Sequence, residues 1–253
     1  MKLKLREHKE FREIFRNLGK NNIEDITFNL DRNKLCIKET DRTMVSFFDI
    51  NFKSSYFDEY ELNVINNTFN KENNTPEILT ISLIDFNNIL KNIDKNAKIE
   101  LNTVKNTLNI ISETEYTTTQ NLELLNFKKD ELPIINNMQF KSSFIINSKN
   151  LIEIIKKFSN DNSLIFYTET DKINFKTEKD LITIYKGTDI LTDLNPNNAK
   201  SKYSMEHLTK LIGFFKLFDK VKVSFSNDFP IKFNMSNDNI SIDIILAPRI
   251  ESE

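Results

Sequence analysis

The sequence predicts an α+β protein made of two tandem domains of one similar fold. Two segments, Phe11 to Leu18 and Leu151 to Phe158, carry apolar residues at positions i, i+3, i+4 and i+7, the pattern of a helix with one buried face. A pair of alternating segments around a short polar turn follows each of them, as expected for a β-hairpin. Because the same order recurs in both halves of the chain, we infer an internal repeat.

The hairpins can be placed from their alternation and their turns. In the first half, the strands are expected at Asp25 to Leu30 and Lys34 to Glu39. In the second half, they are expected at Ser163 to Thr168 and Lys172 to Thr177. The polar stretches Asp31 to Asn33 and Glu169 to Asp171 would form the turns, since such residues favour tight connections.

A second module repeats as well. The segments Ile81 to Leu90 and Tyr203 to Ile212 each predict a strand that runs into a short helix. Further alternating strands follow, at Lys98 to Leu101, Thr107 to Ile111, Lys220 to Phe225, Ile231 to Met235 and Ile240 to Leu246. Each half then has two helices on one face of antiparallel strands, which defines the α+β class. We expect domains at 1–122 and 138–253, with a connector at 123–137.

Composition narrows the classes of function. The longest apolar runs are far too short to span a bilayer, and the N-terminus lacks the pattern of a secretory signal, so we expect an intracellular protein. Cys36, His8 and His207 offer no plausible zinc site, and three scattered glycines cannot build a nucleotide-binding loop. We therefore expect neither a metal nor a cofactor, and no enzyme, although carboxylate chemistry assembled from distant residues stays open. A formal net charge of −2 means that any contact with DNA requires local segregation of charge.

Four short motifs carry a resemblance to a known family. They are Leu246 to Glu251 at the C-terminus, Asp41 to Ser46 before Phe47 and Phe48, Phe57 to Tyr60, and Asp228 to Pro230. In this order and spacing they resemble the DNA sliding clamps of the proliferating-cell nuclear antigen (PCNA) type, found in eukaryotes, archaea and some viruses. The resemblance covers essentially the whole chain. It implies two similar domains per subunit, and three subunits that close a ring around duplex DNA without a catalytic residue or cofactor.

In this family, basic residues on the helices line the central hole. The resemblance therefore implies DNA contact by the basic residues of the four predicted helices, which are Lys9, Arg12, Arg16, Lys20, Lys91, Lys149, Lys156, Lys157 and Lys210. Arg12, Arg16 and Lys20 recur every four residues, so they share one side of their helix. From the residues alone, a solvated face paired with nearby glutamates is the competing interpretation.

The resemblance also implies a groove for partner peptides beneath the connector. Its residues would be Thr40, Met44, Val45, Phe47, Leu132, Pro133, Pro230, Ala247 and Pro248. Such a groove captures an aromatic anchor in an apolar pocket. Val45, Phe47 and Ala247 could equally be ordinary core residues.

Subunit contact in the family pairs an edge strand of one domain with an edge strand of the next subunit. The corresponding strands are expected at Glu113 to Gln120 and Leu181 to Lys186. Their β-branched and aromatic residues are the candidates for this contact, namely Thr114, Tyr116, Thr118, Ile182, Ile184 and Tyr185. Pairing within a single subunit is the alternative.

The implied partners are double-stranded DNA, bound without sequence specificity, and DNA polymerase, a clamp loader, flap endonuclease and ligase through short peptide motifs. The ring could be a homotrimer or a heterotrimer with homologous subunits. Its place would be the cytoplasm or nucleoid in an archaeon and the nucleus for a eukaryotic or viral protein. Two other functions stay open: a checkpoint-type or transcription-linked clamp homologue, and a metal-dependent nuclease with a carboxylate site.

Overall fold

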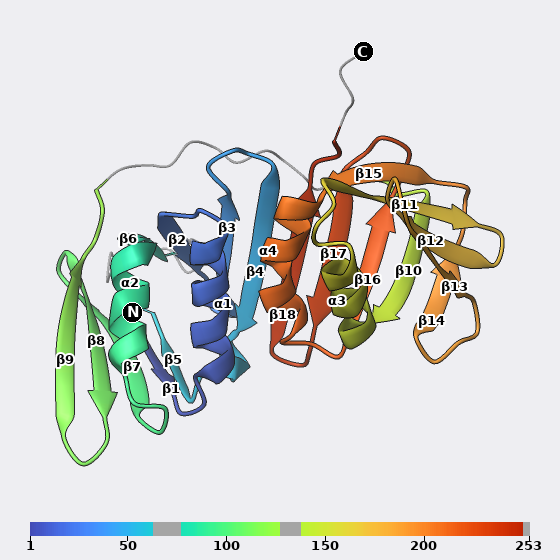
Figure 1. Ribbon diagram of the computed structural model, residues 1–253. Helices are drawn as coiled ribbons and strands as arrows, with labels where there is room; N and C mark the ends of the chain where they lie inside the picture. Colours follow the sequence, from blue (N-terminus) through green and yellow to red (C-terminus); the bar gives the residue numbers. More distant parts are fainter. Residues whose placement is uncertain (63–76, 127–137, 250–253) are drawn as a thin grey trace, which may run out of the picture. The chain divides into compact units, whose positions relative to one another are not determined.

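The computed structural model describes residues 1–62, 77–126 and 138–249, which form two compact units (Figure 1). The first unit takes residues 1–39, 49–62, 77–126 and 238–241, and the second takes 40–48, 138–237 and 242–249. The predicted boundaries at 122 and 138 treat each domain as one continuous stretch of chain. In the structure, residues 40–48 belong to the second unit and residues 238–241 to the first. The predicted connector and the end of the C-terminal motif lie almost wholly outside the described residues. Among the described residues, no helix has both the length and the apolar character to cross a membrane.

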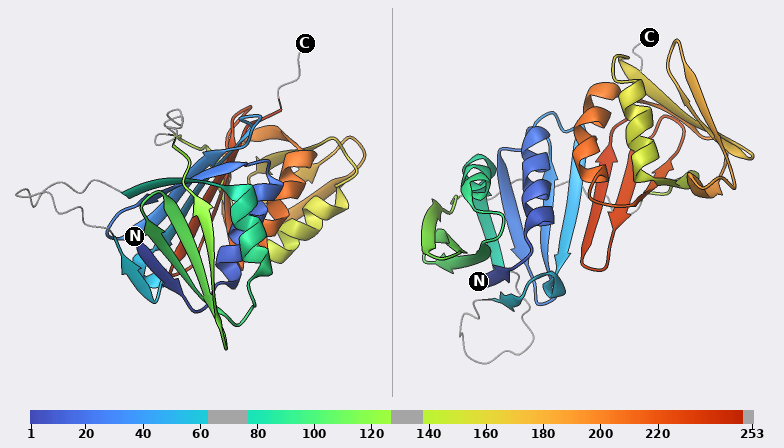
Figure 2. Two further views of the ribbon diagram at one scale, coloured as in Figure 1. Left: turned by 90° about the vertical axis from the view of Figure 1, so that its left-hand side faces the viewer. Right: turned by 60° about the horizontal axis from the view of Figure 1, so that its bottom comes forward.

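The first unit contains the helices α1 (Lys9–Lys20) and α2 (Leu83–Asn92). The predicted stripe of α1 is buried, because Phe11, Phe15 and the aliphatic residues between and beyond them point into the core. The side chain of Ser82 caps α2 by accepting a hydrogen bond from the amide of Asp85 at 3.3 Å. The two helices lie side by side (Figure 2).

Antiparallel strands complete the first unit. One sheet has the order β5-β1-β7-β8-β9, and its strands are β1 (Lys2–Leu5), β5 (Glu59–Glu61), β7 (Lys98–Val104), β8 (Thr107–Glu113) and β9 (Thr117–Glu123). The other strands follow the order β4-β3-β2-β6, and they are β2 (Asp25–Leu30), β3 (Lys34–Thr40), β4 (Ser46–Lys53) and β6 (Glu77–Ser82). A single 3-10 turn, η1, covers Ser54–Tyr56.

The second unit repeats this arrangement with α3 (Ser148–Lys157) and α4 (Met205–Phe215), which also lie side by side. A four-stranded antiparallel sheet has the order β13-β12-β11-β15, with β11 (Ser163–Glu169), β12 (Lys172–Lys176), β13 (Leu181–Tyr185) and β15 (Lys200–Ser204). The remaining strands follow the order β14-β10-β16-β17-β18, with β10 (Ser142–Asn147), β14 (Leu191–Asn195), β16 (Lys220–Phe225), β17 (Ile231–Ser236) and β18 (Ile240–Leu246).

Each unit has an aromatic core of its own. In the first unit, the rings of Phe15 and Phe86 meet edge to face with centroids 5.1 Å apart. In the second, Phe166 and Phe175 do the same at 5.1 Å across the β11–β12 hairpin. Burying each such side chain contributes roughly 1.5–3 kcal/mol, so the phenylalanine-rich composition supplies much of the cohesion of both units.

The predicted α+β class is therefore confirmed, and the helices and hairpins fall close to their predicted positions. One predicted strand needs correction. Glu113 to Gln120 is not one strand, because β8 ends at Glu113 and a turn intervenes before β9 begins at Thr117. Thr114 and Tyr116 lie in that turn, where the amide of Thr114 donates to the carbonyl of Tyr116.

Candidate functional site

Helix α1 presents most of its basic side chains to solvent. Arg16 and Lys20 are exposed on the side opposite the buried stripe, whereas Arg12 is half-buried. The guanidinium of Arg12 donates to the carbonyl of Ile93 at 3.1 Å, so this residue also anchors the segment that follows α2. Arg16 is paired with Glu13 on the same helix. The row of basic residues thus exists, but two of its members already have partners.

The other helices carry the remaining basic candidates. Lys9 and Lys91 in the first unit and Lys149, Lys156 and Lys157 on α3 are exposed, and none has an ion-pair partner among the described residues. On α4, the ammonium of Lys210 pairs with the carboxylate of Glu206 at 2.8 Å. This lysine lowers the pKa of Glu206, so α4 presents a neutralised pair, whereas Lys9 and Lys20 of α1 and the lysines of α3 have no ion-pair partner among the described residues.

A tight loop presents the exposed part of the predicted groove. The carboxylate of Asp41 accepts hydrogen bonds from the amides of Val45 at 2.8 Å and Ser46 at 3.0 Å, and from the hydroxyl of Thr43 at 2.8 Å. These bonds fold the loop back on itself, and Met44 takes a left-handed conformation with φ 55°. The side chain of Met44 is 70% exposed as a result. The thioether side chain is therefore accessible, as a residue of the predicted groove must be.

The structure brings several of the predicted groove residues together in the second unit. The amide of Ala247 donates to the carbonyl of Val45 at 2.9 Å, so the C-terminal segment lies against the loop that carries Met44. Thr40, Ala247, Pro248 and Pro230 are half-buried. Phe47 is only 9% exposed and contributes mainly to the core. The predicted groove residues Leu132 and Pro133 lie outside the described residues.

β15 is the last strand of its sheet, and two other segments form hydrogen bonds with its outer edge. The amide of Lys200 donates to the side chain of Asn227 at 2.7 Å, and the amide of Asp228 donates to the carbonyl of Lys200 at 3.3 Å. Two residues further along, the amide of Arg249 donates to the carbonyl of Lys202 at 2.7 Å. Strand β15 therefore holds the loop before β17 and the C-terminal segment along one line.

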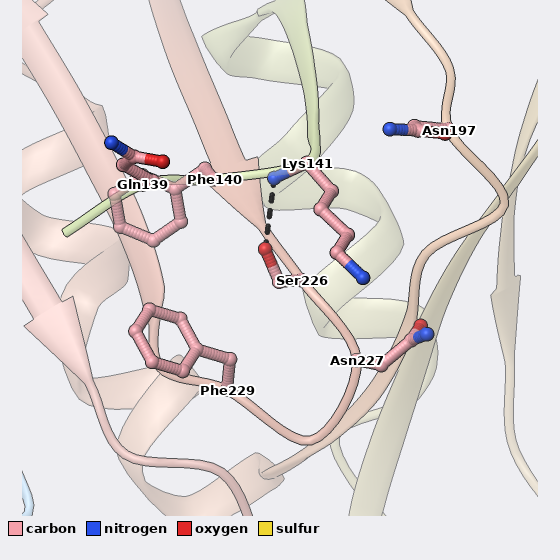
Figure 3. Close-up of a pocket in the computed structure, with 7 residues that line it drawn as sticks. All are labelled: Gln139, Phe140, Lys141, Asn197, Ser226, Asn227 and Phe229. Atoms are coloured by element: carbon pink, nitrogen blue, oxygen red, sulfur yellow. Dashed lines mark hydrogen bonds between the residues drawn. The ribbon is translucent and has the colours of Figure 1, made fainter.

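A pocket that contains none of the predicted site residues lies beside this loop. It is open to solvent, has a volume of about 570 Å³ and is lined by Gln139, Phe140, Lys141, Asn197, Ser226, Asn227 and Phe229 (Figure 3). The rings of Phe140 and Phe229 meet nearly edge to face with centroids 5.9 Å apart. Phe229 belongs to the Asp-Phe-Pro motif and Phe140 follows the predicted connector, so both were within reach of sequence reasoning. Their contact was not, because the two residues lie 89 positions apart in the sequence.

The predicted subunit contacts lie on or next to sheet edges. β9 is the last strand of its sheet, and Thr117 to Asn121 are exposed. β13 is the last strand of the four-stranded sheet, where Leu181 and Tyr185 are 53% and 54% exposed. Ile184 is 8% exposed and packs within its own unit, so its side chain is not available to a neighbour. Among the described residues, no group of three or more histidine, cysteine or acidic side chains is placed to hold a metal ion.

Known proteins resemble this chain over its whole length. No protein-family model matches the sequence. DNA polymerase sliding clamp 3 of Sulfurisphaera tokodaii is 26% identical over 260 residues, which cover 99% of this chain and 100% of that protein. DNA polymerase sliding clamp 2 of Saccharolobus solfataricus is 24% identical over 258 residues, with the same coverage.

Solved structures agree with these relatives. A chain of the PCNA2–PCNA3 complex from Sulfolobus tokodaii superposes with a TM-score of 0.84 at 24% identity and covers 99% of this chain and 100% of that one. PCNA from Entamoeba histolytica gives a TM-score of 0.82 at 20% identity, with 98% of each chain covered. The chain thus has the PCNA fold, and the curated relatives above are DNA polymerase sliding clamps.

Proposed function

We propose that this chain, a homologue of the PCNA-type DNA sliding clamps, is one subunit of a ring that encircles duplex DNA and tethers a DNA polymerase to it. The observation that carries the proposal is the similarity to sliding clamps over 99% of the chain, together with the PCNA fold. The exposed basic residues of α1 and α3 agree with it, because a ring needs only weak, sequence-independent attraction to phosphates. Retention on the DNA then comes from closure of the ring.

The proposal includes three surfaces. The basic helix faces contact DNA, the groove around Met44 and Ala247 receives partner peptides, and the edges β9 and β13 pair between subunits. Subunits could be identical, or could be homologues of one another. Polymerase, clamp loader, flap endonuclease and ligase are the partner classes that such a groove serves. The function requires no catalytic residue.

Retention on circular DNA tests encirclement. The protein is loaded by its cognate loader onto nicked circles, and bound protein is followed before and after linearisation. We expect persistence on circles in salt that abolishes simple phosphate binding, and release after cutting, because a closed ring leaves only over a free end. Equal dissociation from circles and linear DNA would refute the proposal. Retention without stimulation of a polymerase would favour a checkpoint-type or transcription-linked clamp.

The basic face is tested separately. Replacing Arg12, Arg16 and Lys20 together by glutamine should impair loading without changing the oligomeric state. The matched control replaces Lys53, Lys95 and Lys98, which are exposed in the same unit but lie outside its helices. If both triple variants load equally well at every salt concentration, α1 does not face the DNA.

A further inference from the structure

The pocket beside Phe140 and Phe229 has two chemically distinct walls. Figure 3 shows the two rings on one side, with the amide of Gln139 next to Phe140, and the side chains of Lys141, Asn197 and Asn227 on the other. Ser226 lies between them, 7% exposed, and its hydroxyl oxygen accepts a hydrogen bond from the amide of Lys141 at 2.8 Å. A wall dominated by two aromatic rings that faces a polar wall suits a ligand that carries both apolar and polar groups.

The polar wall offers hydrogen-bond donors. The side-chain oxygen of Asn227 is already occupied by the amide of Lys200, so its NH₂ group remains to donate. The ammonium of Lys141 has no ion-pair partner among the described residues, and no carboxylate belongs to the lining. The hydroxyl of Ser226 can donate as well, since it uses its oxygen toward Lys141. A wall of donors with one positive charge is complementary to an anion.

The pocket adjoins the proposed peptide groove through strand β15. The hydroxyl of Tyr203 on this strand donates to the carbonyl of Phe229 at 2.8 Å, and the hydroxyl of Ser201 reaches the same carbonyl at 3.4 Å. The carbonyl of Lys202, between these two residues, holds the amide of Arg249 just after Pro248. The pocket wall and the end of the groove are therefore fixed to consecutive residues of one strand.

We propose that this pocket receives an acidic residue of the partner peptide, carried next to the part of the peptide that occupies the groove. The carboxylate would lie against Lys141 and the amide of Asn227, while the aliphatic part of the same residue would pack on Phe140 and Phe229. The inference rests on the proposed function, since it needs a peptide in the groove. Lys141 would then contribute to specificity, because it would discriminate between peptides that place the same aromatic residue in the groove.

The test compares matched peptides. Each carries a glutamine, an aliphatic residue and two adjacent aromatics, with a single glutamate placed in turn at each of three positions on either side of this core. Its counterpart carries glutamine at that position. We expect one position where the glutamate peptide binds about twofold to fivefold more tightly, as a solvent-accessible ion pair allows. The preference should shrink as salt is added.

Two variants localise the effect. Lys141→Met should abolish the preference for glutamate, and Lys141→Glu should reverse it. Both leave the hydrogen bond to Ser226 intact, because that bond uses the backbone amide of residue 141. Lys222→Met is the matched control, since Lys222 is exposed in the same unit but neither lines the pocket nor belongs to the proposed DNA-contacting residues. This control should keep the preference.

The outcomes separate the two proposals. Equal affinity of glutamate and glutamine peptides at every position, or a preference that survives in Lys141→Met, would overturn the pocket while leaving the groove in place. Absence of binding by all peptides to the folded wild-type protein would refute the groove itself and the pocket with it.

Discussion

Cys36 on β3 combines burial with a neighbouring negative charge. It is 8% exposed, and its thiol lies 3.8 Å from the carboxylate of Asp49. Burial, and to a lesser degree Asp49, raises the pKa of this thiol to about 11 from its ordinary value of 9.0. Only the thiolate reacts, so the raised pKa makes the native thiol slow to modify.

We expect the native protein at pH 8 to react with a thiol reagent at least about 100-fold more slowly than the denatured chain, since its thiolate fraction is smaller by that factor. Burial slows the reaction further. The rate at which the reagent modifies Cys36, measured with and without denaturant, tests this prediction. A native rate within tenfold of the denatured rate would contradict the assigned environment of Cys36.

His8, at the start of α1, offers a second test at this scale. It is 3% exposed, and one ring nitrogen lies 2.9 Å from the carbonyl of Ala97. Burial is the main cause that lowers the pKa of His8 below its ordinary value of 6.5. Below pH 6.5, His8 is therefore protonated in the unfolded chain but stays neutral in the native chain until the pH falls further. The free energy of unfolding decreases as the pH falls below about 6.5. Urea unfolding between pH 7.5 and 5 should show this loss, and it should be smaller in His8→Gln than in the wild-type protein.

Asp41 determines the shape of the Met44 loop. Its carboxylate organises two amides and one hydroxyl, and asparagine would keep its size but remove the charge. We expect Asp41→Asn to weaken partner-peptide binding by about 1–2 kcal/mol, because charge-assisted bonds are replaced by weaker ones. Calorimetric titration measures the change. Asp58→Asn, an exposed aspartate in the first unit, should bind as the wild type does; a similar loss in both variants would place the effect outside the loop.

At the scale of the element, the exposed strand β13 supports a test of subunit pairing. Ile182 lies opposite Phe175 on β12 and is only half-buried in a single chain. We expect Ile182→Asp to give monomers, since pairing would bury an unpartnered charge. Sedimentation at several concentrations measures the effect. Val104→Asp is the control, because Val104 is 48% exposed at the end of β7 and outside the proposed edge. If both variants assemble equally, β13 is not an interface.

The elements differ in how far the sequence could predict them. Helix α1 was predictable because its apolar residues follow the helical period, and the β2–β3 hairpin because both strands alternate around a polar turn. The short strand β1 was missed because its main partner, β7, lies about 100 residues away. The same limit hid the site geometry. Val45 and Ala247 belong to two of the recognised motifs, but only the fold reveals the hydrogen bond between their backbones.

At the scale of the whole molecule, assembly should stabilise each subunit. If the ring forms only from folded chains, mass action makes the thermal midpoint rise with protein concentration. We expect this rise for the wild type and not for Ile182→Asp. Scanning calorimetry at protein concentrations from about 1 to 100 µM tests this prediction, because dissociation constants of specific assemblies commonly fall in or near this range. A midpoint independent of concentration in both proteins would argue against self-assembly.

The occupied edge of β15 has a consequence for how copies can add to one another. With Asn227, Asp228 and Arg249 bonded along it, this edge has few free backbone groups to offer an incoming strand. In the four-stranded sheet of the second unit, β13 is the terminal strand that remains open to an added strand. In the five-stranded sheet of the first unit, β9 is longer than the other terminal strand, β5. If β13 of one copy pairs with β9 of the next, as proposed above, the contact is head to tail, and its repetition leads either to a closed cycle or to an open filament. The bonds along β15 therefore disfavour the addition of a further strand at this edge, where a cycle would otherwise branch toward an aggregate.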